Sequence, residues 1–304
     1  MITRRLFVKC AASAASLNLL GTAPLRAQAP NLSVTELAPN TALITGGACN
    51  VIVRKAQNGE LLVVDGGLES GARELRRTIE NTMGKGRITT LINTHWHPEQ
   101  TGLNTLLGNR STRIFAHENT RQWLSTDVKR LWQDYTIPAL PENARPNDTF
   151  YHYGDFKHVD VPVEFGYLRQ AHTDGDMYVF FPADNVLHAG GVIATDGWPF
   201  MDWWTGGWIG GVVDAVETLL SIANDDTVIV PATGPVTNKA ELLAMRDMYA
   251  DIFQKVRSSF TAANTVEQTV AAKPAGPYEA KYGNADEFIT LSHWSLIPHL
   301  TPDA

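Results

Sequence analysis

The chain has 304 residues, of which 44% are hydrophobic and 19% charged, and this composition is typical of a globular protein rather than a disordered or fibrous one. The first 29 residues hold four of the 25 basic side chains and none of the 32 acidic ones, so the rest of the chain carries a formal net charge of −11. A surface of this charge repels phosphate backbones, so we expect no nucleic-acid partner.

The first 29 residues have the features of an export signal. A charged start with Arg4 and Arg5 is followed by a mildly apolar stretch and by the small residues Ala27 and Ala29. The segment Thr-Arg-Arg-x-Phe-Val-Lys resembles the twin-arginine consensus. The apolar stretch is too short and too often interrupted to span a membrane. We therefore expect twin-arginine export, cleavage after Ala27 or Ala29, and a periplasmic or secreted protein without stable membrane insertion.

The remaining chain, residues 30–304, has no repeat of fixed period and no linker-like segment, so we expect a single domain. Its first half alternates short apolar runs with a helical pattern. The predicted strands are 42–44, 50–54, 61–64 and 88–93, and Ala72, Leu75 and Ile79 predict a helix before the last strand. That last strand runs directly into Thr94-His95-Trp96-His97, which places two histidines in a loop at a strand end.

The second half continues the alternation and ends in a weakly patterned segment. The predicted strands are 167–171, 177–181, 186–189 and 228–230, and apolar residues at helical spacing predict helices over 212–220 and 242–256. Asn238 and Glu241 form a plausible capping box for the second helix. His172 follows directly on the predicted strand 167–171. Residues 262–304 lack a clear period, and we expect an irregular C-terminal extension.

Four motifs occur in order along the chain: Val64-Asp65-Gly66-Gly67, Thr94-His95-Trp96-His97-Pro98-Glu99-Gln100-Thr101-Gly102, Ala171-His172-Thr173-Asp174-Gly175-Asp176 and Pro231-Ala232-Thr233-Gly234-Pro235. Together they resemble the metallo-β-lactamase superfamily, over about residues 37–243. The resemblance implies an α/β fold, a four-layer αββα sandwich with a metal site along one edge. His95, His97 and His172 match the three histidines of the family's first zinc site, which implies about one Zn²⁺ per chain.

The positions of the family's second metal site are all changed. Where the family has Asp and then His after the first two histidines, this chain has Glu99 and Gln100. Gly191 stands in place of the bridging Asp, and Thr233 in place of the late His. Glycine offers no side-chain ligand, and threonine and glutamine are poor zinc ligands, so we expect no second tightly held metal.

Glu99 is the candidate catalytic residue, because it keeps a carboxylate where the family uses one to orient or deprotonate the metal-bound water. Its extra methylene moves that carboxylate by about a bond length, and reaction rates are sensitive to shifts of about 1 Å. Two interpretations stay open: a general base with adjusted geometry, or a residual acid on the loop.

Other polar residues are candidates for supporting roles. Asp65 and Asp176 are suited to structural hydrogen bonds, Asp65 to the histidine loop, because metal-bound imidazoles usually donate their other N–H to a carboxylate or carbonyl. His117 and His188 fall where related sequences often have structural histidines.

Aromatic residues gather around these motifs. Trp96 lies between two predicted ligands, and Trp198, Phe200, Trp203 and Trp204 follow Gly191 in a stretch rich in Gly and Pro. That composition is typical of a loop, so we expect these five residues to form an apolar wall for a hydrophobic substrate. The alternative is that the rings fill the core beneath the sheets.

The predicted function is that of an exported, metal-dependent hydrolase. Three neutral imidazoles and one water form a sufficient catalytic zinc site, in which the bound hydroxide attacks an ester, lactone or amide of a small molecule. The alternative is a catalytically degenerate binding protein of the periplasm, motivated by the altered second site. A further alternative, by analogy with related exported proteins, is an accessory role beside a periplasmic protein partner.

Overall fold

The computed structural model describes residues 32–108, 111–130 and 135–301. The predicted export signal lies outside the described residues. Within these ranges, no helix combines the length and the apolar character needed to cross a membrane.

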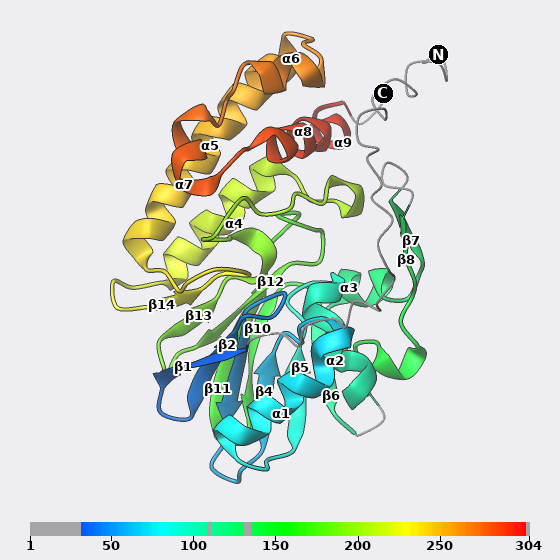
Figure 1. The fold of residues 1–304 in the computed structure, drawn as a ribbon, viewed down its shortest axis with the longest axis vertical. Helices are drawn as coiled ribbons and strands as arrows, with labels where there is room; N and C mark the ends of the chain where they lie inside the picture. The colour runs from blue at the N-terminus through cyan, green and yellow to red at the C-terminus, as the bar shows by residue number, and fades with distance from the viewer. Residues whose placement is uncertain (1–31, 109–110, 131–134, 302–304) are drawn as a thin grey trace, which may run out of the picture.

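Two β-sheets form the centre of the fold (Figure 1). In the described part of the chain, the larger sheet has seven strands in the order β1-β2-β3-β4-β5-β6-β9, and the smaller has five in the order β10-β11-β12-β13-β14. The strands of the larger sheet are β1 Ser33–Ala38, β2 Thr41–Thr45, β3 Val51–Lys55, β4 Leu61–Val64, β5 Ile88–Ile92, β6 Arg113–His117 and β9 Asp148–Phe150. Those of the smaller sheet are β10 Tyr153–His158, β11 Val161–Tyr167, β12 Met177–Phe181, β13 Val186–His188 and β14 Val228–Val230. A separate hairpin pairs β7 Val128–Arg130 with β8 Tyr135–Ile137.

The predicted strands are buried on both faces, which explains their continuous apolar runs. In β4, Leu61 and Val63 belong to the cluster on the outer face of the larger sheet, whereas Leu62 and Val64 belong to the cluster between the two sheets. The inner cluster joins residues of both sheets, including Phe115. The sheets therefore pack face to face, as the resemblance implied.

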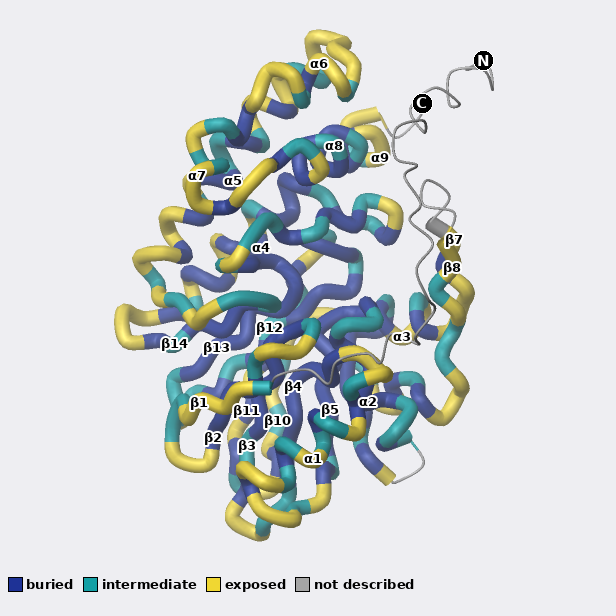
Figure 2. The backbone as a smooth tube through the Cα atoms, in the orientation of Figure 1, coloured by how far each residue is buried: buried dark blue, intermediate teal, exposed yellow. Residues whose placement is uncertain are grey.

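Helices cover the outer face of each sheet (Figure 1). Near the larger sheet lie α1 Ala72–Met83, α2 Pro98–Leu107 and α3 Glu118–Trp123, and near the smaller sheet lie α4 Ile209–Ile222 and α5 Lys239–Thr261. Ile79 of α1 packs in the outer cluster of the larger sheet, and Val216 of α4 and Tyr249 of α5 pack with Leu187 of the smaller one. Figure 2 shows the buried residues gathered along the sheets and their facing helix sides. The four-layer αββα prediction is confirmed.

The C-terminal segment is more ordered than expected. It contains α6 Val266–Ala271, α7 Glu279–Tyr282, α8 Asp286–Ser295 and α9 Ile297–Leu300, which lie beside α4 and α5 (Figure 1). Helices of four to ten residues are too short to show a clear apolar period, so the sequence pattern missed them. A capping box between Thr265 and Gln268 starts α6.

Two local predictions need correction. The strand predicted over 167–171 ends at Tyr167, and the following residues form a loop in which Gln170 has a φ of +46°. At the start of α5, Asn238 accepts the predicted hydrogen bond from the backbone N–H of Glu241. The Glu241 carboxylate pairs instead with Lys281 at 2.8 Å, so the reciprocal half of the predicted capping box is replaced by an ion pair.

Candidate metal centre

The three predicted ligand histidines come from two loops at one edge of the sandwich. His95 and His97 lie between the end of β5 and the start of α2, and Pro98 occupies the first turn of that helix. His172 lies in the loop between β11 and β12. The larger sheet supplies the first loop and the smaller sheet the second, so the site forms only when the two sheets pack.

The structure brings these three side chains together. Their nearest ligand nitrogens all lie within 4.8 Å of one another, and the ring centroids are 4.7 to 4.8 Å apart in edge-to-face arrangements. All three residues are at least 95% buried. Burial, followed by the neighbouring histidines, lowers the pKa of His95 well below its usual range. A neutral imidazole is the form that binds a metal ion.

Asp65 and Thr94 orient His95. The Thr94 hydroxyl donates to Asp65 Oδ2 at 2.8 Å and lies 3.2 Å from His95 Nδ1. A hydroxyl has one hydrogen, so Thr94 accepts the Nδ1 hydrogen of His95, and the lone pair of that ring is on Nε2. Burial raises the pKa of Asp65 to about 8, although the two hydrogen bonds from Thr94 act in the opposite direction. The positive charge of an ion bound to the histidines would lower this pKa. The prediction that Asp65 supports the histidine loop is confirmed.

Asp202 and Asp176 orient the other two rings. His97 Nε2 lies 2.8 Å from Asp202 Oδ2, which leaves the Nδ1 lone pair of His97 for a ligand. His172 Nδ1 lies 3.3 Å from Asp176 Oδ1, which leaves Nε2. Asp176 also accepts from the backbone N–H of His172 at 2.6 Å, so it holds the loop as well as the ring. Three buried imidazoles, each with one ring nitrogen left for a ligand, are a donor set that suits a zinc ion.

The two other histidines predicted to support the site differ in position. His188 accepts from the backbone N–H of Gly190 through Nδ1, and its Nε2 lies 3.7 Å from Asp65 Oδ2, so it packs behind the centre. Burial lowers the pKa of His188 to about 4. His117 instead caps α3 and stacks on Tyr167 at 4.0 Å between ring centroids.

Gly191 occupies a position where no side chain fits. It lies in the 3-10 helix Gly190–Val192, directly against the histidine rings. A Cβ atom added to Gly191 would lie 2.4 Å from His172 Nδ1 and 2.9 Å from His95 Cε1. The backbone therefore fills space that a bridging carboxylate would need. An aspartate at this position would have to displace the first-site histidines.

The remaining altered positions present polar, uncharged groups. Thr233 donates its hydroxyl to Asp196 Oδ1 at 2.7 Å. Gln100 is 4% exposed, and its Oε1 has no hydrogen-bond partner among the described residues. An unpaired buried amide oxygen is costly, typically about 1–3 kcal/mol, and such groups need an explanation. Gln100 is also among the residues that line the cleft over the histidines.

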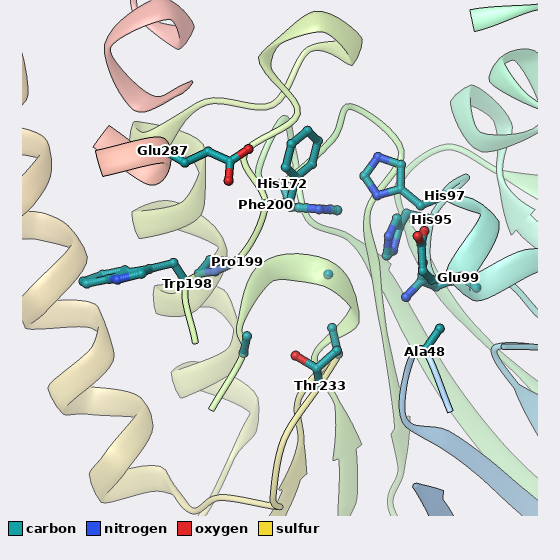
Figure 3. Close-up of a pocket in the computed structure, with 14 residues that line it drawn as sticks. Ala48, His95, His97, Glu99, His172, Trp198, Pro199, Phe200, Thr233 and Glu287 are labelled. Atoms are coloured by element: carbon teal, nitrogen blue, oxygen red, sulfur yellow. The ribbon is translucent and has the colours of Figure 1, made fainter. Parts of the chain in front are cut away.

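A cleft of about 410 Å³ opens over the three histidines (Figure 3). Its lining residues are Ala48, His95, His97, Glu99, Gln100, His172, Gly191, Ala194, Trp198, Pro199, Phe200, Ala232, Thr233 and Glu287. Glu99, in the first turn of α2, directs its carboxylate toward the histidines in Figure 3. The volume suits a small-molecule ligand.

The five predicted aromatic residues separate into two groups. Trp198 and Phe200 line the cleft. Trp96 does not: its side chain is 1% exposed, packs with Leu124 and Val128, and donates to Thr205 Oγ1 at 3.1 Å. For Trp96 the structure agrees with core packing, the alternative considered from sequence.

Trp203 and Trp204 also lie outside the cleft lining. Their rings meet at 5.5 Å between centroids, and Trp203 packs on Trp294 of α8. The segment carrying them is tied to the ligand loops, because Asp202 donates its backbone N–H to the carbonyl of His172 at 3.0 Å. Sequence reasoning missed Asp202, and its place in an aromatic stretch far from the histidine motifs offered no signal.

Comparisons with known proteins agree with this geometry. The sequence model of a family described as the metallo-beta-lactamase superfamily matches residues 44–263. Among solved structures, the DIM-1 metallo-beta-lactamase is 18% identical with a TM-score of 0.58, and the alignment covers 73% of this chain and 99% of that one. A metallo-beta-lactamase from Pontibacter korlensis is 16% identical with a TM-score of 0.60, covering 73% and 100%.

A second kind of enzyme shares the fold. The inverting sec-alkylsulfatase Pisa1 from Pseudomonas sp. is 15% identical with a TM-score of 0.67. That alignment covers 86% of this chain but only 50% of the alkylsulfatase. At these identities the structural likeness concerns the fold alone.

Proposed function

The chain belongs to the metallo-beta-lactamase superfamily, and on this basis we propose that it is an exported hydrolase with one zinc ion, acting on an ester, lactone or amide of a hydrophobic small molecule. One observation carries the proposal: three buried histidines line a cleft with possible ligand nitrogens within 4.8 Å of one another. The export part rests on the twin-arginine pattern of residues 1–29.

An ion held by three imidazoles lowers the pKa of a bound water to about 7 and polarises a carbonyl oxygen. The protein supplies the shape and the proton transfer. Asp176 and Asp202 hydrogen-bond the rings of His172 and His97 directly, and Asp65 acts on His95 through the Thr94 hydroxyl. Because these carboxylates are themselves buried, they keep the rings from rotating when substrate enters.

Glu99 is the proposed general base. It lines the cleft and forms no hydrogen bond or ion pair with another described residue, so its carboxylate is available for substrate or water. Glu99 would accept a proton from the attacking water and return it to the leaving oxygen or nitrogen. This assignment favours the first of the two interpretations of Glu99.

Gln100 is the proposed substrate-binding residue beside the base. Gln100 lines the cleft, and its amide oxygen has no hydrogen-bond partner among the described residues, so a small rotation of this side chain would let it hydrogen-bond a polar group of the substrate. In this proposal, the compartment that holds a second metal in relatives binds substrate here. The non-catalytic alternative draws on the same changes at Gln100, Gly191 and Thr233, which would leave a binding cleft without turnover.

Metal analysis and hydrolysis separate the two functions. Inductively coupled plasma mass spectrometry on protein purified without chelator is expected to find about one zinc per chain. His172→Ala should lose this zinc, whereas the control His152→Ala, which removes an exposed histidine, should keep it. A panel of activated esters and lactones then tests turnover. Zinc without any turnover would support the binding protein, and no zinc in the wild type would contradict the hydrolase.

A further inference from the structure

The C-terminal helix α8 forms part of the cleft wall. Glu287 of α8 lines the cleft, although the family match ends at residue 263. Trp198 fixes this arrangement, since its indole N–H donates to the carbonyl of Gly283 at 2.9 Å. The Trp198 ring also stacks on Phe288, with 4.9 Å between centroids and 17° between planes. This part of the wall is therefore packed firmly against the rest of the fold. The residues that α8 contributes to it lie beyond the residues that the family model matches.

Glu287 differs from the neighbouring acids in having no partner. Asp286 and Glu279 both pair with Lys273, and Glu241 pairs with Lys281. Among the described residues, Glu287 makes no hydrogen bond or ion pair. Figure 3 shows its carboxylate directed from α8 toward Phe200 and the histidines. The free negative charge therefore faces the space that a substrate would fill.

The charged side chains that line the cleft all have the same sign, and the zinc ion proposed at the histidines would add positive charge only at the floor of the cleft. Its described lining residues include two carboxylates, Glu99 and Glu287, and no lysine or arginine. An adjoining hollow of about 540 Å³ shares Ala48 and Thr233 with the cleft. It adds Asp196 and, among its described lining residues, again no basic side chain. A recess lined by charges of one sign concentrates ligands of the opposite sign and repels ligands of the same sign.

We propose that the substrate carries an ammonium group, which pairs with Glu287 while the scissile carbonyl lies at the histidines. The apolar part of such a molecule would pack against Phe200 and Trp198, because aromatic walls accept both alkyl and cationic groups. This inference rests on the proposed hydrolase function and narrows it to cationic esters or amides.

Binding of a quaternary ammonium tests the inference without any turnover. The probe is benzyltrimethylammonium, titrated into the zinc-loaded protein by isothermal calorimetry. Glu287→Gln keeps the side-chain volume and removes the charge, and because Glu287 is exposed, affinity should fall about two- to fivefold. The control Asp286→Asn removes the same charge from the adjacent position, where the carboxylate faces Lys273, and should change affinity less than twofold.

Three results would overturn the inference: no measurable binding by the wild type, equal binding by Glu287→Gln, or an equal loss in Asp286→Asn. An equal loss in Asp286→Asn would show that binding depends on the net charge of the protein and not on the position of Glu287. Added salt should weaken binding to the wild type more than to Glu287→Gln, because screening acts on the ion pair.

A matched pair of esters distinguishes this inference from the hydrolase proposal. The phenylacetate ester of choline is expected to have a higher kcat/KM than the uncharged 3,3-dimethylbutyl ester, and Glu287→Gln should reduce this preference about two- to fivefold. If neither ester is hydrolysed while the ammonium still binds through Glu287, the hydrolase proposal fails for these esters and the cation site stands. If both are hydrolysed equally, the cation site is wrong and the hydrolase stands.

Discussion

His97 contacts Asp202, 105 residues further along the chain, with 2.8 Å between Nε2 and Oδ2. The contact joins a candidate ligand at the start of α2 to the aromatic segment 198–208. That segment also reaches the other ligand loop, through the backbone N–H of Asp202 and the carbonyl of His172. One residue thus couples the metal centre to the wall of the cleft.

Asp202→Asn should weaken metal binding. An asparagine amide can turn its N–H toward His97 Nε2, and it carries no negative charge to stabilise a ring that binds metal through Nδ1. Loss of such a supporting carboxylate lowers metal affinity roughly 10- to 100-fold. Zinc affinity is measured by competition with a chromophoric chelator. A zinc affinity equal to that of the wild type would show that the Asp202 carboxylate does not support the His97 ring for metal binding.

Gly191→Asp should not create a second metal site. Its Cβ would clash with His172 Nδ1 at 2.4 Å, so we expect a loss of about 1–3 kcal/mol in the free energy of unfolding, as for an overpacked core, together with weaker binding of the first zinc. Urea denaturation and metal analysis measure the two effects. Gly197→Ala is the matched control, because a Cβ there has no atom within 4 Å. Binding of two zinc ions by Gly191→Asp would contradict the packing argument.

Glu99→Gln should separate chemistry from metal binding. Removing a general base lowers kcat roughly 10²- to 10⁴-fold, whereas the zinc content should stay unchanged because Glu99 is not among the three clustered ligands. The readouts are steady-state hydrolysis of an activated ester and metal analysis on the same sample. An unchanged kcat would assign Glu99 to the second interpretation, a residual acid.

His117 should make stability depend on pH. Burial lowers the pKa of His117 in the folded protein below the ordinary value of 6.5. Its Nδ1 accepts a hydrogen bond from the backbone N–H of Asn119 at 3.2 Å, which only the neutral ring can do. Its contribution is therefore present above about pH 6.5 and is lost as the pH falls through the lowered pKa.

The variant His117→Asn tests this dependence, because asparagine can cap the helix and does not titrate. Urea unfolding of both proteins between neutral and mildly acidic pH gives the free energy of unfolding at each pH. The wild type should lose more stability on acidification than His117→Asn does. Parallel curves would show that His117 does not contribute to the pH dependence.

Much of the local structure was predictable from the sequence because it depends on neighbouring residues. The run Leu61–Val64 is apolar at every position, and this predicts a strand buried on both faces wherever it packs. Asn238 caps the helix that follows it through a hydrogen bond to a residue three positions away, so this contact is local in sequence. His95, His97 and His172 were identified by motifs that include their neighbours. The short helices of the C-terminal segment gave no comparable signal, since their stability comes from packing.

The tertiary structure decided which side chains meet. Trp96 and Trp198 are both tryptophans near glycine and proline, yet one is buried in a small cluster and the other lines the cleft. The apolar character of a side chain indicates that it will be buried, but it does not indicate which residues will pack against it. Asp202 and Glu287 became visible at the site for the same reason, because their roles depend on contacts across 105 residues and on the docking of α8. The sequence by itself determined the fold and the three candidate ligands, and only packing determined their orientation, the blocked position at Gly191 and the acidic side chains that line the cleft.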